Sequence, residues 1–169
     1  MRLSSRTFGR STHIPAYPET MHVSIEKLEA HAIDQFIELI RVFDVVFDMD
    51  GFKMPPSAYL QRVLAQDTFW VFVAVVDDKV VGGLTAYVLP QYYTQRPLVY
   101  LYDLAVSHDY QRRGIGSQLV AGLNNYCRSL GIDEVFVQAD GDDVEAINFY
   151  RATGGLAEQV VHFTYPLTE

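Results

Sequence analysis

The sequence predicts a single α/β domain in which a mixed, mostly antiparallel central sheet is flanked by helices. Three observations lead to this fold class: residues with helical spacing precede the strands, β-branched and aromatic runs fill the middle of the chain, and strand and helix patterns then alternate. Strands joined by short turns pair antiparallel, whereas strands separated by a helix pair parallel. At 169 residues the chain is long enough for one domain with a substantial core.

Two helices are predicted first. Apolar residues recur at helical spacing between Ile25 and Phe47, which predicts a helix that ends around residues 48–51, with a break near its start as an alternative. The stretch SAYLQRVLAQ, residues 57–66, follows a proline pair and predicts a second, short helix, because proline is tolerated at the start of a helix.

Three strands are predicted next. Two apolar runs separated by a turn at residues 77–79 predict a hairpin, and a loop bounded by prolines leads to a third strand. The expected strands are Thr68–Val76, Val80–Leu89 and Leu98–Val106.

The remaining chain alternates between helix and strand. A helix over residues 114–131 is expected to stop at Gly131, and a second helix is expected over residues 143–155, where Asp142 and Glu145 resemble a capping box. Strands are expected over residues 133–139 and, in the stretch EQVVHFTYPL, over residues 158–167.

Composition narrows the class of protein. The chain is 49% hydrophobic and 20% charged, as expected for a soluble globular protein, and no apolar run has the roughly 20 residues of a membrane span. The net charge of -8 argues against nonspecific nucleic-acid binding and favours a cationic small-molecule partner, although acidity also serves solubility. The histidines lack metal-ligand spacing, so no metal is expected.

The single cysteine and the N-terminus bear on location. Cys127 cannot form an internal disulfide, which suits a reducing compartment and predicts a cytoplasmic protein. Residues 1–20 are rich in Arg and Ser and are expected to form a flexible tail before a domain at 21–169, with a transit peptide as the alternative.

The stretch QRRGIG, residues 111–116, joins the third strand to a helix through glycines. The first backbone N–H groups of a helix have no intrahelical partner, so such a turn favours phosphate binding. A Walker A loop requires Lys-Ser or Lys-Thr after its last glycine, but Ser117 and Gln118 follow here. A dinucleotide fingerprint requires a third glycine where Leu119 stands, so neither of these nucleotide motifs is present.

The same hexapeptide resembles the pyrophosphate loop of the GNAT N-acetyltransferases, as do the preceding LAV and the later AINFYRATGG. The stretches AYVLP, YLYDLAVS, VQADGDD and HFTYP further resemble the type I aminoglycoside 3-N-acetyltransferases. The resemblance implies a GNAT fold with a splayed central strand pair, acetyl-CoA as the acetyl donor, and transfer to the 3-amino group of drugs such as gentamicin. The loop after Ala139 is one residue shorter than in that family, and Val144 replaces a proline.

The resemblance also implies residue roles. Asp103 would be the general base, with a buried structural carboxylate as the alternative. Tyr150 would be the acid that protonates the departing thiolate, with packing in the core as the alternative. The acetyl-CoA site would comprise Leu104, Ala105, Val106, Gln111, Arg112, Arg113, Gly114, Ile115, Gly116, Ser117 and Asn148. Two clusters of acids, together with the net charge, suit a cationic acceptor, although any single acid could instead cap a helix or face solvent. The expected acceptor contacts are Tyr102, Asp48, Asp140, Asp142 and Asp143.

Regular strand alternation would place Asp103 on the face of Leu101 and Ala105, opposite Tyr100 and Tyr102. There we expect burial to raise its pKa toward that of a useful base, or a water molecule to relay the proton.

Two other functions remain open from the sequence. The acceptor could be a polyamine or a protein amine, or the chain could be a nonenzymatic module that binds acetyl-CoA. A homodimer is compatible with the apolar residues of the last expected strand.

Overall fold

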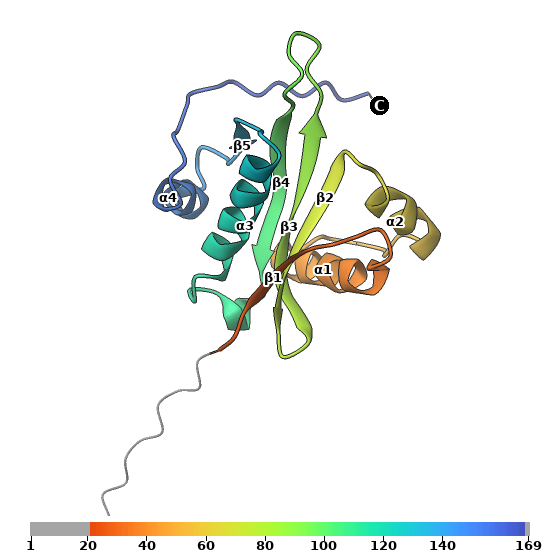
Figure 1. Cartoon of the computed structure of the whole chain (residues 1–169). Coiled ribbons are helices and arrows are strands. Elements are labelled where there is room, and N and C mark those ends of the chain that lie inside the picture. The colour runs from red at the N-terminus through yellow and green to blue at the C-terminus, as the bar shows by residue number, and fades with distance from the viewer. Residues whose placement is uncertain (1–20, 168–169) are drawn as a thin grey trace, which may run out of the picture.

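The computed structural model describes residues 21–167, so the predicted tail at 1–20 lies outside the described residues. One five-stranded sheet has the order β1-β2-β3-β4-β5 (Figure 1). The strands are β1 Ser24–Lys27, β2 Phe69–Val76, β3 Lys79–Leu89, β4 Leu98–Val106 and β5 Val135–Val137. The first four strands pair antiparallel in chain order and β4 pairs parallel with β5, so the predicted mixed, mostly antiparallel sheet is confirmed.

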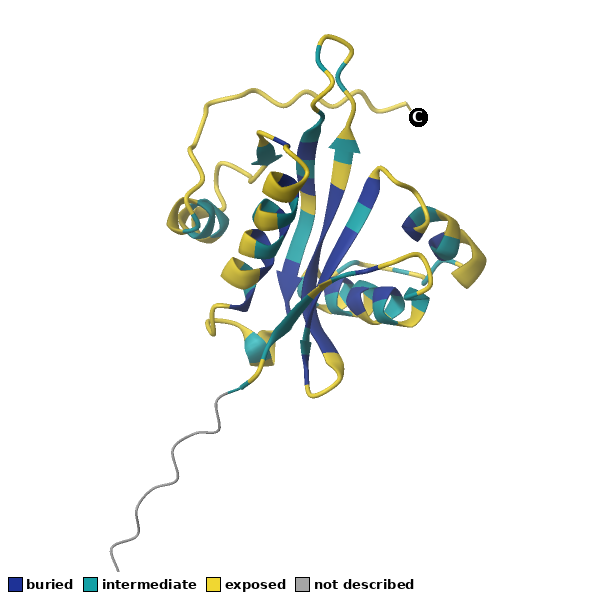
Figure 2. Cartoon of the chain, viewed as in Figure 1, coloured by how far each residue is buried: buried dark blue, intermediate teal, exposed yellow. Residues whose placement is uncertain are grey.

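Helices cover both faces of the sheet. Helices α1 Ile33–Val46 and α2 Ser57–Leu64 lie on one side in Figure 1, and α3 Ile115–Ser129 and α4 Val144–Ala152 lie on the other. Buried residues line the strands and the helix faces that meet them (Figure 2). The core therefore has two layers, one between the sheet and α1 with α2, the other between the sheet and α3. In the part of the chain that the structure describes, no helix combines the length and apolar character that a membrane span needs.

The turns between elements follow the predicted chemistry. Asp77 and Asp78 both have positive φ, 48° and 60°, which closes the hairpin between β2 and β3. Gly131, at φ 70°, ends α3 as predicted, because glycine adopts the left-handed conformation without steric cost.

Gly83 allows α1 to pack closely on the sheet. A Cβ atom at this position would lie 2.5 Å from the backbone oxygen of Phe72 and 2.7 Å from Cδ1 of Leu39. Real Cβ atoms do not approach other heavy atoms so closely, so β2, β3 and α1 meet at a point where only glycine fits.

The prediction of a helix starting at Ile25 is wrong. Residues Ser24–Lys27 form the edge strand β1, paired with Phe72–Val75 of β2, and the helix starts at Ile33. Ile25 packs against α3, since a Cβ on Gly122 would lie 2.9 Å from its Cγ2 atom. Pairing with the edge of β2 and the contact of Ile25 with α3 favour a strand here. They outweigh the helical spacing of the apolar residues, which is weak evidence for a helix over only four residues.

The predicted strand at 158–167 is also wrong. Within the described residues this stretch makes no strand pairing, and it leaves α4 and runs across the top of the view without joining the sheet (Figure 1). Alternating apolar residues need a partner edge to become a strand, and the sheet edge formed by β5 is only three residues long. The segment's large apolar side chains are consequently exposed: Val160, Val161, Phe163, Tyr165 and Leu167.

Candidate active site

A β-bulge in β4 sets the position of Asp103. Thr85 of β3 pairs with Asp103 and the next residue, Ala86, pairs with Leu101, so Tyr102 is an extra residue in β4. Leu101 packs in the core layer of α3, whereas Ala105 packs in the layer of α1. The expectation that Asp103 shares a face with Leu101 is therefore wrong.

The bulge instead brings tyrosines to the face of Asp103. The ring of Tyr102 lies 5.5 Å from that of Tyr87 and 5.6 Å from that of Tyr100, measured between centroids. Tyr87 in turn contacts Phe69, which belongs to the core layer of α1. Regular alternation predicted these tyrosines on the opposite side, and a bulge is not visible in the residue pattern.

Thr85 holds the Asp103 carboxylate. Its hydroxyl donates a hydrogen bond of 2.9 Å to Oδ2 of Asp103. Thr85 is 4% exposed and is the one buried polar residue of the described chain. Sequence analysis missed this residue, because a lone threonine in an apolar strand is also typical of ordinary β-structure.

Burial raises the pKa of the Asp103 carboxyl above its ordinary value, and the hydrogen bond from Thr85 partly offsets this by stabilising the charged form. The predicted direction of the shift is confirmed. When it is ionised, a carboxylate with a raised pKa is a better proton acceptor.

The turn before α3 exposes backbone donors. Arg112 and Gly114 both have positive φ, 60° and 78°, and Gly114 is the N-cap of α3 without a side-chain cap. The first N–H groups of α3 are therefore free of a capping side chain, and the helix dipole adds partial positive charge there. A non-glycine residue at positive φ carries local strain, which is typical of functional loops.

Side chains of the same turn take different positions. The guanidinium of Arg113 lies over the ring of Tyr110, 5.6 Å from its centroid, and is exposed like Arg112 and Ser117. Gln111 donates from Nε2 to the backbone oxygen of Val106 at 2.9 Å, so its amide fixes the loop to the end of β4. This contact favours a structural role for the Gln111 side chain.

Other predicted acetyl-CoA residues are buried. The side chains of Ala105, Val106 and Ile115 are 3%, 8% and 1% exposed, so only their backbone atoms can face a ligand.

The pairing of β4 with β5 ends at Leu101↔Val137, and no other described strand borders this edge of β4 beyond that point. The short β5 thus leaves this edge of β4 without a strand partner from Leu104 to Val106, at the place where the splay is predicted.

Helix α4 brings Tyr150 toward the same end of α3. A Cβ on Gly116 would lie 3.2 Å from the ring of Phe149, and that ring contacts Tyr150 at 5.1 Å between centroids. Burial raises the pKa of the Tyr150 hydroxyl, and the nearby carboxylates of Asp143 and Asp103 raise it further. Tyr150 therefore stays protonated at neutral pH, as a proton donor must. Asn148 is exposed on the same helix.

The acidic loop before α4 is exposed, as expected for contacts with a cationic acceptor. Asp143, not Asp142, caps α4: its Oδ1 accepts a hydrogen bond of 2.9 Å from the backbone N–H of Ala146. The predicted capping box of Asp142 and Glu145 is therefore not formed, because Asp143 is the N-cap and Ala146 stands three residues after it. Asp140 and Asp142 keep exposed side chains. Asp48 lies apart in sequence, in the turn after α1, with φ 49°.

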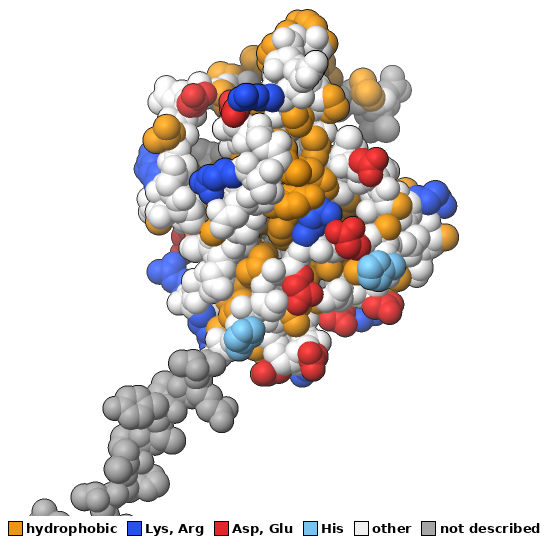
Figure 3. Space-filling model, in the orientation of Figure 1, with side chains coloured by type: hydrophobic (Ala, Val, Ile, Leu, Met, Phe, Trp, Pro, Cys, Tyr) orange, Lys and Arg blue, Asp and Glu red, His pale blue; other side chains and the backbone are white. Residues whose placement is uncertain are grey.

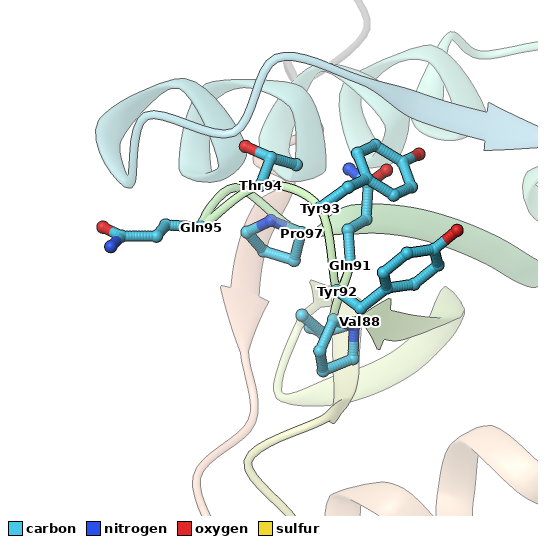
Figure 4. A pocket seen from close by; sticks show the side chains of 8 residues that line it. Val88, Gln91, Tyr92, Tyr93, Thr94, Gln95 and Pro97 are labelled. Carbon is cyan, nitrogen blue, oxygen red and sulfur yellow. The ribbon is translucent and has the colours of Figure 1, made fainter.

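A surface hollow of about 590 Å³ lies in the loop between β3 and β4 and contains none of the predicted site residues (Figure 4). Acidic and basic side chains are interspersed around a central hydrophobic band on the face seen in Figure 3. Over residues 21–167, no three His, Cys, Asp or Glu side chains are grouped to hold a metal ion. The residues around Asp103 and the turn before α3 remain the candidate site.

A sequence model of the acetyltransferase (GNAT) family matches residues 27–154. Among solved structures, the chain is similar to an aminoglycoside acetyltransferase from an uncultured soil metagenomic sample. Its complex with trehalose shows 50% identity and a TM-score of 0.84 over 86% of this chain and 97% of that one. Its complex with sisomicin shows 49% identity with the same TM-score and coverage.

A second aminoglycoside acetyltransferase from an uncultured soil metagenomic sample is 33% identical, with a TM-score of 0.82 over 88% of this chain and 100% of that one. An aminoglycoside N-acetyltransferase of the 6′ type, solved with CoA, is 18% identical with a TM-score of 0.72 over 90% of this chain and 99% of that one, so it shows the fold alone. No curated protein sequence matches the chain.

Proposed function

The chain belongs to the acetyltransferase (GNAT) family, and we propose that it transfers an acetyl group from acetyl-CoA to the 3-amino group of an aminoglycoside. The observation that carries the acceptor class is the 49% identity, over 86% of the chain, to an aminoglycoside acetyltransferase solved with sisomicin. The stretches YLYDLAV and QADGDD support the 3-amino position through their resemblance to the type I 3-N enzymes.

The turn before α3 fits the pyrophosphate of acetyl-CoA. The uncapped N–H groups after Gly114 provide donors, and exposed Arg112 and Arg113 provide charge. Acetyl-CoA supplies an acetyl thioester, whose carbonyl carbon accepts a nucleophile. From Leu104 to Val106, β4 pairs with β3 on one edge, whereas its other edge has no described strand partner once the pairing with β5 ends. The N–H groups that point from this unpaired edge are our candidates for stabilising charge on the carbonyl oxygen.

Asp103 acts as the general base in this proposal. Most amines are protonated at neutral pH, and only the neutral form attacks a carbonyl carbon, so a nearby carboxylate has two roles. It attracts the cationic acceptor and accepts the proton that the amine loses. The raised pKa of Asp103 reduces the difference in pKa between this carboxyl and an amino-sugar amine, which eases proton transfer from the amine.

Tyr150 acts as the general acid. The new N–C bond forms as the C–S bond breaks, the electron pair of that bond leaves on sulfur, and the thiolate accepts the phenolic proton of Tyr150. The ammonium group of the acceptor first loses one proton to solvent by way of Asp103, and the attacking nitrogen then loses its second proton to Asp103. Solvent finally deprotonates Asp103 and reprotonates Tyr150, so the products are an acetamide, CoA and one proton. The exposed carboxylates of Asp140 and Asp142 add further attraction for an acceptor with several positive charges.

The function can be tested with a panel of acceptors. The protein is incubated with acetyl-CoA and, separately, sisomicin, gentamicin, kanamycin, spermidine or a lysine peptide, and CoA release is followed with a thiol reagent. Cys127 is buried and burial raises its pKa to about 11, so the folded protein adds little background. We expect release with aminoglycosides and a product acetylated at the 3-amino group by NMR.

Other outcomes would separate the alternatives. Release confined to spermidine or the peptide would overturn the aminoglycoside acceptor, and acetylation at the 6′-amino group would overturn only the position. Binding of acetyl-CoA without release in any reaction would favour a nonenzymatic module.

A further inference from the structure

Aromatic rings form a continuous row across one face of the sheet. Between ring centroids, Phe69 of β2 lies 5.1 Å from Tyr87 of β3, Tyr87 lies 5.5 Å from Tyr102 of β4, and Tyr102 lies 5.6 Å from Tyr100. The ring of Tyr100 stacks on Phe136 of β5 at 4.7 Å with an angle of 3° between planes. The row therefore crosses four strands of the sheet.

The row is buried at one end and open in its middle. Phe69 is 6% exposed, whereas Tyr87 is 37% exposed and Tyr102 is 56% exposed. Large aromatic side chains are normally well buried, so two adjacent exposed rings supported by buried neighbours form a preformed apolar surface.

Asp103 lies next to this open part. The bulge places Asp103 and Tyr102 consecutively on one face, and Thr85, the partner of Asp103, is two residues from Tyr87 on β3. The carboxylate also acts on the rings: burial raises the pKa values of Tyr87 and Tyr100, and the charge of Asp103 raises both further. A negative charge and apolar ring surfaces thus share one site.

The rings are held rigidly. The ring planes of Tyr102 and its two tyrosine neighbours are nearly perpendicular, at 89° and 87°, which is a favourable packing for aromatic pairs. The hydroxyl of Tyr100 donates to Oε1 of Gln138 at 2.9 Å, which fixes that ring at the end of β5. A ligand that packs on this surface therefore loses little binding energy to ordering side chains.

We propose that Tyr87, Tyr100 and Tyr102 form a platform on which one ring of an amino-sugar acceptor packs while its reacting amine meets Asp103. This proposal rests on the proposed function and specifies how the acceptor is selected. A ring has an apolar C–H face for an aromatic surface, and its ammonium groups gain further from aromatic faces. A linear polyamine presents the same charges without a flat, rigid face, so the platform favours ring acceptors over linear amines.

Tyr102 provides the direct test because it is the most exposed of these rings and contacts both of the others. We expect Tyr102→Ala to raise KM for sisomicin about 5- to 30-fold, with KM for acetyl-CoA within about twofold. Tyr102→Phe keeps the ring and is expected to stay near the wild-type KM. Tyr92→Ala, a change at a 99% exposed residue in the loop between β3 and β4, is the matched control.

The measurements distinguish this proposal from the proposed function. Steady-state kinetics are combined with calorimetric titration of sisomicin into each folded variant, so that binding is seen without turnover. An active wild type with an unchanged KM and Kd in Tyr102→Ala would overturn the platform alone, as would an equal effect of Tyr92→Ala. A wild type that binds sisomicin but does not acetylate it, with weaker binding in Tyr102→Ala, would support the platform and overturn the proposed function.

Discussion

Thr85→Val is expected to move the pH dependence of acetyl transfer. Valine has nearly the shape of threonine and favours strands, so it fits this 4% exposed position while removing the hydroxyl that donates to Asp103. That hydrogen bond stabilises the carboxylate form and lowers the pKa of Asp103, so its loss leaves the effect of burial unopposed.

The size of the shift follows from the hydrogen bond. A hydrogen bond to a charged acceptor contributes about 1.5–3 kcal/mol, and one pKa unit corresponds to about 1.4 kcal/mol, so the pKa of Asp103 should rise by about 1–2 units. A general base works only when deprotonated, so the acidic limb of kcat/KM should move to higher pH by the same amount. The tyrosines that face Asp103, namely Tyr87, Tyr100 and Tyr150, have pKa values raised by burial and stay protonated through this range.

The assay is a profile of kcat/KM against pH for wild type, Thr85→Val and Thr85→Ser, with saturating acetyl-CoA. Thr85→Ser keeps the hydroxyl and should restore most of the wild-type profile. The ¹³C carboxyl shift of Asp103 gives its pKa independently of turnover. An acidic limb that stays in place in folded Thr85→Val, or that moves equally in Thr85→Ser, would refute the reasoning.

Three substitutions and one labelling experiment test other parts of the structure. Asp103→Asn should lower kcat by about 100-fold or more, and it should raise the Tm at pH 7 because it removes a charge that burial disfavours. This gain in Tm should shrink as the pH falls through the raised pKa of Asp103 in the folded protein, and it should vanish below the pKa of Asp103 in the unfolded chain. A lower Tm at neutral pH would contradict this expectation. Tyr150→Phe should slow turnover while Kd for acetyl-CoA by calorimetry stays constant; unchanged turnover would exclude it as the acid. Gly83→Ala should lower the free energy of unfolding by about 1–3 kcal/mol in urea titrations, because its methyl would collide with β2 and α1, whereas Gly141→Ala has open space and should change little. Cys127 should resist iodoacetamide at pH 8 in the native protein and react in urea, as measured by mass spectrometry; rapid native labelling would show that the thiol is accessible.

The strands and helices with many apolar residues could be predicted from sequence. Strand β4 has the predicted bounds Leu98–Val106, and β2 and β3 differ from the predicted strands by one residue each. Their runs are long, and the positive-φ turn at Asp77 and Asp78 separates them clearly. Strong local signals and tertiary packing agree in this part of the chain.

The short edge elements could not be predicted. Strand β1 has four residues and follows the edge of β2 rather than a pattern of its own, and the stretch at 158–167 has the alternation of a strand without a partner. Edge strands depend on which edges are available, and that information is in the tertiary structure.

The candidate site divides in the same way. The turn before α3, Asp103 and Tyr150 carry recognisable residue types at recognisable places. Thr85 and the surroundings of Asp103 depend on which residues of β3 and β4 face each other, and the bulge changes that relation by one position. Pairing across strands is a long-range property, so residue spacing within one strand does not reveal it.

The bulge also has a consequence for how β4 can vary in length. In a regular strand, odd-numbered and even-numbered residues face opposite sides of the sheet. The extra residue Tyr102 reverses this relation between the two halves of β4, so odd-numbered residues before the bulge and odd-numbered residues after it face opposite sides. Deleting one residue here would bring the halves back into phase, and either Leu101 or Asp103 would turn to the wrong side of the sheet. Substitutions in this segment alter one side chain at a time, whereas a change of length reverses a whole half-strand. Natural variants of this segment should therefore differ in composition and keep the number of residues constant.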